Sequence, residues 1–233
     1  MEILKAVNLD KKYGKGQNEF YALKDVNLSI KKGEFVCIIG KSGSGKSTLI
    51  HLLSGLDTPS SGDIIINNEK INNLSKNKMT IFRRKNIGII YQFYNLIPIL
   101  NVEENIKLPL MLDKRKVGNK HLKEIINSLE LKEKTNLLPS ELSGGQQQRV
   151  SIGRALITRP KILFADEPTG NLDTQNTSTV MKLLKYYNRK YKQTIIMVTH
   201  DLSLTKNCSR VIRMKDGRIV KDELKKIHFK KQK

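Results

Sequence analysis

The sequence predicts an α/β fold with a mostly parallel sheet and a helical segment inserted into it. Short runs rich in β-branched residues occur in both halves of the chain, and helix-like segments follow or separate them. From about residue 95 to residue 159 the pattern changes, and apolar residues recur every three or four positions. Strands that alternate with helices around such an insertion are typical of an α/β domain.

In the first part of the chain, short apolar runs bounded by turn residues predict strands: VNLSI (26–30), FVCII (35–39), DIIIN (63–67) and NIGIIYQ (86–92). KKGE connects the first two runs as a turn, and STLIHLLSGL (47–56) has the apolar pattern of a helix. The composition of DTPSSGD (57–63) predicts a loop.

The inserted segment predicts two helices, VEENIKLPLML (102–112) and HLKEIINSLEL (121–131). We expect Pro109 to bend or interrupt the first of them. The runs KILFAD and TIIMVTH then predict buried strands, separated by a helix over TSTVMKLLKYYNRKY. The charged end of the chain, KKIHFKKQK, is expected to be frayed.

Composition excludes several classes of protein. Hydrophobic residues make up 38% of the 233 residues, enough to fold one large domain or two small ones without disulfides. No apolar run approaches a membrane span, and the N-terminal stretch lacks the apolar segment of a secretory signal. Cys37 and Cys208 are the only possible cysteine pair and do not make a disulfide framework, so we expect a reducing, cytosolic compartment.

The formal net charge of +21 allows two interpretations. It favours a polyanionic partner, or it reflects a composition that is rich in lysine. Arginine, which base and phosphate readers prefer, is much the rarer cation, and aromatic residues do not alternate with basic ones. We expect a weak preference for an anionic membrane surface and no specific nucleic-acid partner.

GKSGSGKS, residues 40–47, fits the pattern of a phosphate-binding loop between a predicted strand and a predicted helix. Glycines let backbone N–H groups converge on phosphate oxygens, and the helix that begins at Lys46 adds its positive end. The alternative is a flexible Gly/Ser loop. We expect this stretch to bind the nucleotide, through Gly40, Lys41, Ser42, Gly43, Ser44, Gly45, Lys46, Ser47 and Thr48.

ILFADEP supplies the acidic strand end that such a loop requires. Asp166 at the strand tip can hold magnesium through water, and Ser47 is the hydroxyl ligand of that ion. Glu167 can accept a proton from an attacking water as general base. A solvated strand end is the alternative for an isolated acid pair. With the phosphate loop, the pair predicts that the chain binds and hydrolyses ATP or GTP.

LSGGQ occurs a hundred residues later, and its residues predict a second anion-binding helix terminus: Leu142, Ser143, Gly144, Gly145 and Gln146. Ser143 is a good helix cap, and the glycines expose backbone N–H groups where the helix starts. The chain has a single phosphate loop, so this second terminus has no nucleotide of its own.

LSGGQ, the phosphate loop and ILFADE together resemble the nucleotide-binding subunit of an ABC transporter. The resemblance implies two subunits facing head to tail, with the signature of one contacting the γ-phosphate that the other holds. It implies a single ABC ATPase domain: a P-loop NTPase (RecA-like) core at 1–92 and 158–222 with an antiparallel β subdomain, an inserted α-helical signature subdomain at 93–157, and a basic tail at 223–233. The implied ligands are ATP and Mg²⁺.

The resemblance also implies roles for single residues. Gln92 resembles the Q-loop glutamine that contacts magnesium and senses the permease. His200 resembles the switch histidine that bonds the γ-phosphate and acts in catalysis with Glu167 and Gln92, although a lone histidine at a strand end is normally unremarkable. Tyr13, near Phe20 and Tyr21, resembles the aromatic that stacks on adenine.

The resemblance also implies two further sets of residues, one at the dimer interface and one at the metal ion. The D-loop across the dimer interface consists of Asn171, Leu172 and Asp173. The Mg²⁺ ligands are Ser47, Gln92 and Asp166.

Longer motifs, among them LDTPSSGD, PSELSGGQQQRVSIGRAL and ADEPTGNLD, resemble the group that serves lipoprotein release, macrolide export and resistance to bacitracin-like or lantibiotic peptides. This implies an integral membrane permease as partner, contacted by residues 93–105, and a peripheral location on the cytoplasmic face of the cell membrane. This sequence departs from the usual motifs of that group at Lys41, Tyr91, Ser151 and Gly153. A cell-division-type regulator without transport, or an ABC ATPase acting on nucleic acid, remains an alternative.

Overall fold

The computed structural model describes residues 1–115 and 118–225, and its strands form two sheets. The larger sheet has six strands, in the order β10 (Arg218–Leu224), β9 (Arg210–Lys215), β3 (Phe35–Ile39), β8 (Thr194–Thr199), β7 (Ile162–Asp166) and β6 (Ile87–Ile90). Its strands are parallel except for the antiparallel pair β9–β10. The predicted α/β fold with a mostly parallel sheet is therefore confirmed.

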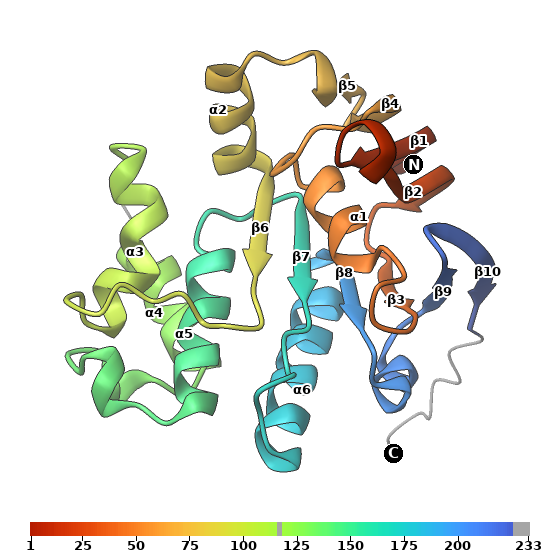
Figure 1. Cartoon of the computed structure of the whole chain (residues 1–233). Coiled ribbons are helices and arrows are strands. Elements are labelled where there is room, and N and C mark those ends of the chain that lie inside the picture. Colours follow the sequence, from red (N-terminus) through yellow and green to blue (C-terminus); the bar gives the residue numbers. More distant parts are fainter. Residues whose placement is uncertain (116–117, 226–233) are drawn as a thin grey trace.

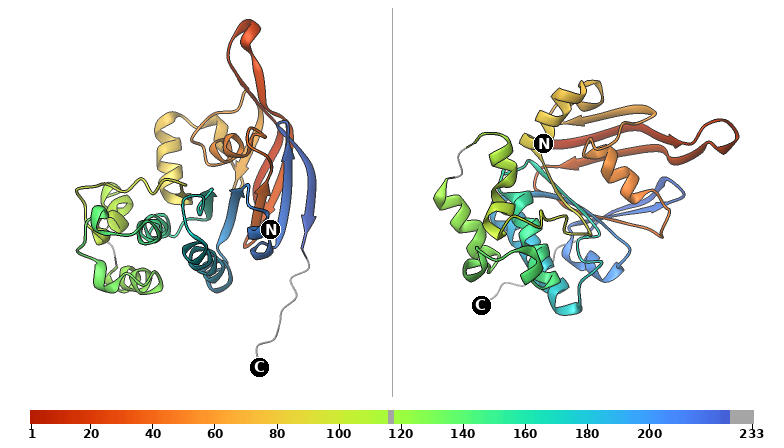
Figure 2. Two further views of the ribbon diagram at one scale, coloured as in Figure 1. Left: turned by 60° about the horizontal axis from the view of Figure 1, so that its bottom comes forward. Right: turned by 60° about the vertical axis from the view of Figure 1, so that its left-hand side comes forward.

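The smaller sheet is antiparallel, in the order β2 (Phe20–Lys31), β1 (Glu2–Tyr13), β4 (Ser61–Ile66) and β5 (Glu69–Lys70). It lies on one side of the six-stranded sheet, and the inserted helices lie on the other side (Figures 1 and 2). The helices are α1 (Lys46–Leu53), α2 (Lys76–Asn86), α3 (Val102–Leu112), α4 (Asn119–Ser128), α5 (Gly144–Leu156) and α6 (Thr174–Tyr191).

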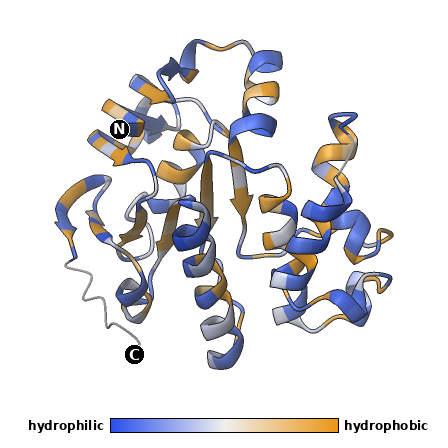
Figure 3. Ribbon diagram, turned by 180° about the vertical axis from the view of Figure 1, so that it is seen from behind, coloured by the Kyte–Doolittle hydropathy of each residue, from blue (hydrophilic) through white to orange (hydrophobic). Residues whose placement is uncertain are grey.

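Strand β3 separates two hydrophobic cores. All five of its residues are buried. Phe35, Cys37 and Ile39 point into the core shared with the inserted helices, whereas Val36 and Ile38 point toward α1 and the antiparallel sheet. A strand buried on both faces reads as continuous apolar sequence, which is why FVCII carries no polar alternation. Figure 3 shows that the strands at the centre of the molecule are mostly hydrophobic.

The register of the parallel strands brings four strand ends to one edge of the sheet. Ile39 pairs with Thr199, Asp166 with Val198, and Ile90 with Ala165. The loops that follow β3, β6, β7 and β8 consequently start close together. In open α/β sheets, ligands bind outside the carboxyl ends of the strands.

Helix α2 was not predicted from the sequence. It starts at the cap residue Ser75, whose side chain accepts a hydrogen bond from the Lys78 backbone N–H, and it buries Phe82. Lysine and arginine dominate the segment, so it has no continuous apolar stripe of the kind that marks a helix.

Of the two effects expected of Pro109, a bend or an interruption, the structure excludes the interruption. The helix continues through Pro109 to Leu112. Proline lies in the last turn, where it removes a single intrahelical hydrogen bond, and a capping box between Asn101 and Glu104 stabilises the start of the helix.

The structure describes only the first residues of the predicted basic tail. Strand β10 continues to Leu224, so the first residues of the segment 223–233 belong to the sheet. Lys225 donates hydrogen bonds to the backbone carbonyl and the hydroxyl of Thr205. The expected fraying of the tail concerns residues 226–233, which lie outside the described residues.

The two cysteines meet in the core. Cys37 on β3 and Cys208 before β9 are paired, and their Cα atoms are 5.9 Å apart. The sequence identified them as the only possible pair, but their separation of 171 residues gave no sign of contact.

Among the described residues, none of the helices combines the length and the apolar character needed to cross a membrane.

Candidate functional site

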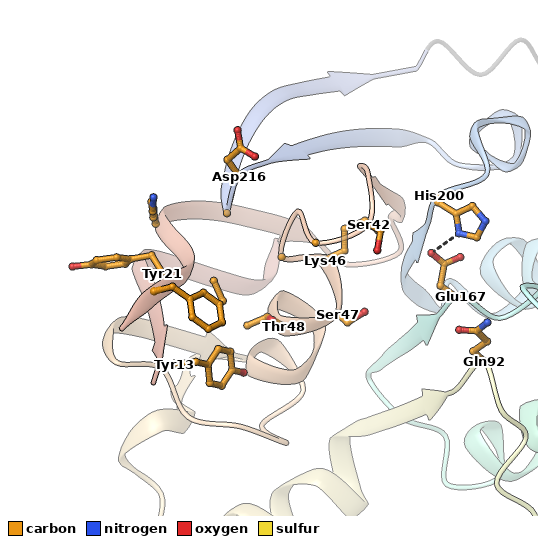
Figure 4. Close-up of a pocket in the computed structure, with 16 residues that line it drawn as sticks. Tyr13, Tyr21, Ser42, Lys46, Ser47, Thr48, Gln92, Glu167, His200 and Asp216 are labelled. Carbon is orange, nitrogen blue, oxygen red and sulfur yellow. Dashed lines mark hydrogen bonds and ion pairs between the residues drawn. The ribbon is translucent and has the colours of Figure 1, made fainter. Parts of the chain in front are cut away.

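A cavity of about 590 Å³ lies beside α1 and reaches the carboxyl edge of the parallel strands (Figure 4). This volume falls within the range of small-molecule sites. Its walls are Tyr13, Phe20, Tyr21, Ala22, Lys24, Ser42, Gly43, Gly45, Lys46, Ser47, Thr48, Gln92, Glu167, His200, Asp216 and Gly217.

The loop between β3 and α1 can adopt its shape only with glycine at certain positions. Gly45, the N-cap of α1, has a φ of +94°, and an added Cβ would lie 2.6 Å from the Ala22 carbonyl oxygen. Such a contact would force the loop away from β2. Glycine therefore lets the first turn of α1 lie against β2, with Lys46, Ser47 and Thr48 lining the cavity.

Lys46 is held against the loop that precedes it. Its side-chain ammonium donates to the carbonyl oxygens of Gly40 (3.0 Å) and Lys41 (2.9 Å), and the residue is buried. A buried ammonium with no carboxylate partner among the described residues is a strong site for an anion. The Ser44 hydroxyl nearby is buried and has no hydrogen-bond partner in the described chain.

Asp166, at the end of β7, faces α1. The Ser47 hydroxyl donates to its Oδ1 (3.2 Å), and His51 Nε2 lies 3.9 Å from its Oδ2. Burial raises the pKa of Asp166, and the hydrogen bond from Ser47 opposes this shift. A hydroxyl and a carboxylate in contact are the oxygen ligands that Mg²⁺ prefers, so the residues fit that ion.

Glu167 is held in an unusual backbone conformation. Its φ is +47°, a left-handed value that is uncommon outside glycine. The Glu167 N–H donates to the Val198 carbonyl, and the Glu167 carbonyl accepts from the Gly170 N–H. Its carboxylate Oε1 lies 3.0 Å from His200 Nδ1, the contact drawn in Figure 4. Ten other non-glycine residues in the described part of the chain have positive φ, so the contact with His200 and the position in the cavity wall distinguish Glu167.

Gln92 lines the same cavity from the loop after β6. Its amide nitrogen donates to Asn171 Oδ1 (3.3 Å), and the Asn171 amide donates back to the Gln92 carbonyl (3.4 Å). The two loops are therefore linked by reciprocal hydrogen bonds. A Cβ on Gly170 would lie 2.9 Å from the Gln92 amide nitrogen, so Gly170 packs closely against this side chain.

Aromatic side chains form the wall of the cavity at the end away from Glu167 and His200 (Figure 4). The Tyr13 hydroxyl donates to Asp57 Oδ2 (2.8 Å), and its ring lies 5.9 Å from the ring of Phe20. Burial, followed by this hydrogen bond, raises the pKa of Tyr13. The hydroxyl is thus occupied away from the cavity, and the ring remains to contact a ligand.

The sequence analysis missed four residues of the cavity wall: Ala22, Lys24, Asp216 and Gly217. The Lys24 N–H donates to the Gly217 carbonyl (2.9 Å), which joins β2 to the turn between β9 and β10. The dipeptide Asp216–Gly217 signals a hairpin turn in the sequence, but nothing in it places that turn beside β2.

The LSGGQ residues do not line this cavity in the described chain. Ser143 caps α5 through a capping box: its Oγ accepts from the Gln146 N–H, and Gln146 Oε1 accepts from the Ser143 N–H. Leu142 is buried and Ser143 is exposed. This helix start is therefore presented away from the cavity that holds Lys46.

The signature is packed against the start of α6. A Cβ on Gly145 would lie 2.0 Å from Asn176 Oδ1, and one on Gly144 would lie 2.7 Å from the Tyr94 hydroxyl. Asp173 caps α6 and accepts from both the backbone and the side chain of Asn176, which lowers its pKa. Leu172 packs on the core beside it.

The structure thus separates the predicted residues into two groups. Glu167, His200, Gln92, Tyr13 and most of the phosphate loop line one cavity. Gly40, Lys41, Ser44 and Asp166 support it without lining it, and the signature and residues 171–173 lie outside it. One cavity can bind a nucleotide and offer a base; the second helix terminus can contact an anion held elsewhere.

Residues 23–170 match the model of a family described as ABC transporter. The chain is 48% identical over 220 residues to MJ1508 of Methanocaldococcus jannaschii, an uncharacterized ABC transporter ATP-binding protein, and the match covers 94% of this chain and 98% of that protein.

Among solved structures, the chain is similar to the ABC transporter cassette MJ0796, described as bacterial. The TM-score is 0.87 at 42% identity, with 95% of this chain and 98% of that chain covered. That cassette is dimeric, and one of its structures is a post-hydrolysis state with ADP and phosphate. CbiO1 from Clostridium perfringens, part of the transporter complex CbiONQ, has a TM-score of 0.83 at 31% identity, with 96% and 88% covered.

Proposed function

The chain belongs to the ABC transporter family, and from this premise we propose how its residues use ATP and which kind of membrane system it powers. It is an ATP-binding, ATP-hydrolysing subunit of an ABC transporter. The observation that carries the residue assignments is the single cavity in which Lys46, Gln92, Glu167 and His200 meet.

ATP binds with its phosphates at the start of α1. Lys46 exchanges the carbonyl oxygens of its own loop for the phosphate oxygens, and the backbone N–H groups of Gly43 to Thr48 surround them. The ring of Tyr13 stacks on adenine. Ser47, Asp166 and Gln92 would hold Mg²⁺, which when bound would neutralise phosphate charge.

Glu167 orients the attacking water and accepts its proton. Its contact with His200 holds the carboxylate at the cavity wall. His200 bonds the γ-phosphate, so the base and the phosphate contact are adjacent. The positioned groups supply catalysis mainly by geometry and electrostatics.

Two copies of the chain form a head-to-tail dimer. The exposed start of α5 at Ser143 then contacts the nucleotide held by the partner subunit, which explains a signature that lies outside its own cavity. Residues 171–173 cross the interface. The solved structures of the cassette MJ0796 are described as dimeric, which supports a dimer of this chain.

Within each copy we assign the core with its β subdomain to 1–92 and 158–222, and the helical subdomain to 93–157. The permease contacts residues 93–105, a segment in which Phe93 and Ile99 are exposed. The chain consequently works at the cytoplasmic face of the membrane as a peripheral subunit. Motifs such as PSELSGGQQQRVSIGRAL support a permease for antimicrobial-peptide resistance or export, or for lipoprotein handling.

A pull-down from native membranes tests this function. The Glu167→Gln chain, tagged and extracted in gentle detergent with ATP, is expected to retain an integral membrane protein with a large extracellular domain, identified by mass spectrometry. The Lys46→Ala chain is the control for nucleotide dependence. Recovery of ribosomes or nucleic acid without a membrane protein would contradict the transport role.

A further inference from the structure

Gln148 is a buried polar residue that the proposed mechanism does not use. It lies on α5, two positions after the signature, and is 0% exposed. Its side-chain amide nitrogen donates to two backbone carbonyls, those of Tyr91 (3.2 Å) and Pro168. A buried amide is expensive unless it is hydrogen-bonded, so these two bonds explain how it is tolerated.

The two acceptors belong to the loops that carry the catalytic groups. Tyr91 directly precedes Gln92, and Pro168 directly follows Glu167. The loops leave the neighbouring strands β6 and β7, in which Ile90, the last residue of β6, pairs with Ala165, one residue before the end of β7. One amide group therefore joins both loops immediately next to their functional residues.

The orientation of the amide is fixed by its surroundings. A flipped side chain would point its oxygen at two carbonyl oxygens, whereas the observed one places donors there. The amide oxygen, Oε1, has no hydrogen-bond partner among the described residues.

A second side chain of α5 holds the same segment. Arg154 donates from its guanidinium to the carbonyls of Tyr94 (2.9 Å) and Asn95 (2.6 Å). Helix α5 thus bonds the backbone on both sides of Gln92 and Phe93. Gln148, unlike Arg154, also donates a hydrogen bond to the loop that carries Glu167.

We infer that Gln148 is a positioning residue for hydrolysis: it joins the signature helix to the loops of Gln92 and Glu167 and sets the distance between them. Movement of α5 on contact with the partner's nucleotide then reaches both loops through one side chain. The inference rests on the proposed role of Glu167 as general base.

The test is Gln148→Met, which keeps the length of the side chain and removes both donors. We expect kcat for ATP hydrolysis to fall about 10- to 100-fold, because small displacements of a base have effects of this size. KM and the affinity for a fluorescent ATP analogue should change less than about threefold, because the hydrogen bonds of Gln148 go to the loops of Gln92 and Glu167 and not to the phosphate loop, within the described part of the chain.

Gln193 offers a matched control. Its amide nitrogen also donates to two backbone carbonyls, those of Pro160 (3.0 Å) and Thr194 (3.2 Å), but at the opposite ends of β7 and β8. Gln193→Met removes equivalent bonds far from the catalytic loops and should leave kcat within about twofold. Thermal unfolding of both variants shows whether they are folded; Gln148→Asn, which keeps an amide but shortens its reach, replaces Gln148→Met if that chain does not fold.

The same substitution in a Glu167→Gln background separates positioning from general damage. If Gln148 acts chiefly by placing Glu167, its substitution should slow single-turnover hydrolysis much less in the Glu167→Gln background than in the parent chain. An equal fall in both backgrounds, or a kcat as high as that of Gln193→Met, would overturn the inference. Normal turnover by Glu167→Gln itself would instead reject the assignment of the base.

Discussion

Glu167→Gln is expected to bind ATP normally and to hydrolyse it about 10²- to 10⁴-fold more slowly. The substitution keeps the size of the side chain and its contact with His200 Nδ1, since an amide can also take part in that hydrogen bond. It removes the group that accepts the proton of the attacking water. The measurement is phosphate release at saturating ATP, beside a binding titration with a fluorescent ATP analogue.

Glu69→Gln is the charge-matched control, because Glu69 is exposed on β5, outside the cavity. It should hydrolyse ATP at the normal rate. Normal turnover by the Glu167→Gln chain would refute the assigned base, whereas loss of binding would point to a role in holding the nucleotide.

Lys46→Ala should weaken nucleotide binding itself. The ammonium is buried beside the loop carbonyls of Gly40 and Lys41 and can turn to phosphate oxygens without leaving its position in α1. Losing hydrogen bonds from a charged group costs about 1.5–3 kcal/mol, so the Kd should rise about 10- to 100-fold.

A titration with the fluorescent ATP analogue measures this change. Lys76→Ala, at an exposed lysine that begins α2, removes the same charge outside the cavity and should bind as the parent chain does. Equal affinities for the two variants would show that Lys46 does not contact the phosphates.

The phosphate loop and its strand could be predicted because their signals are local. FVCII is buried on both faces, and the glycines after it mark the turn into α1. The meeting of Glu167 and His200 also follows from the sequence, once both are placed after neighbouring parallel strands. Loops at the carboxyl edge of a parallel sheet converge whatever their separation in the chain.

Other parts of the fold and of the site depend on tertiary contacts that produce no recognisable pattern in the local sequence. The lysine- and arginine-rich helix α2 buries Phe82 and lacks an apolar stripe. The turn at Asp216 reaches the cavity only because β2 lies beside the β9–β10 hairpin. Gln148 is one of three adjacent glutamines, and nothing in its identity distinguishes the buried one. Tertiary packing decides such positions.

The head-to-tail pairing is tested most directly by the molar mass of the Glu167→Gln chain in light scattering, with and without ATP. The account predicts a monomer without nucleotide and a dimer with ATP. Ser143→Asp in this chain should abolish the dimer, because it keeps a good helix cap but places a negative charge against the partner's γ-phosphate. Ser143→Asn, an uncharged cap of the same shape, should retain it. A dimer as stable with aspartate as with asparagine would contradict the claim that the signature of one subunit serves the nucleotide of the other.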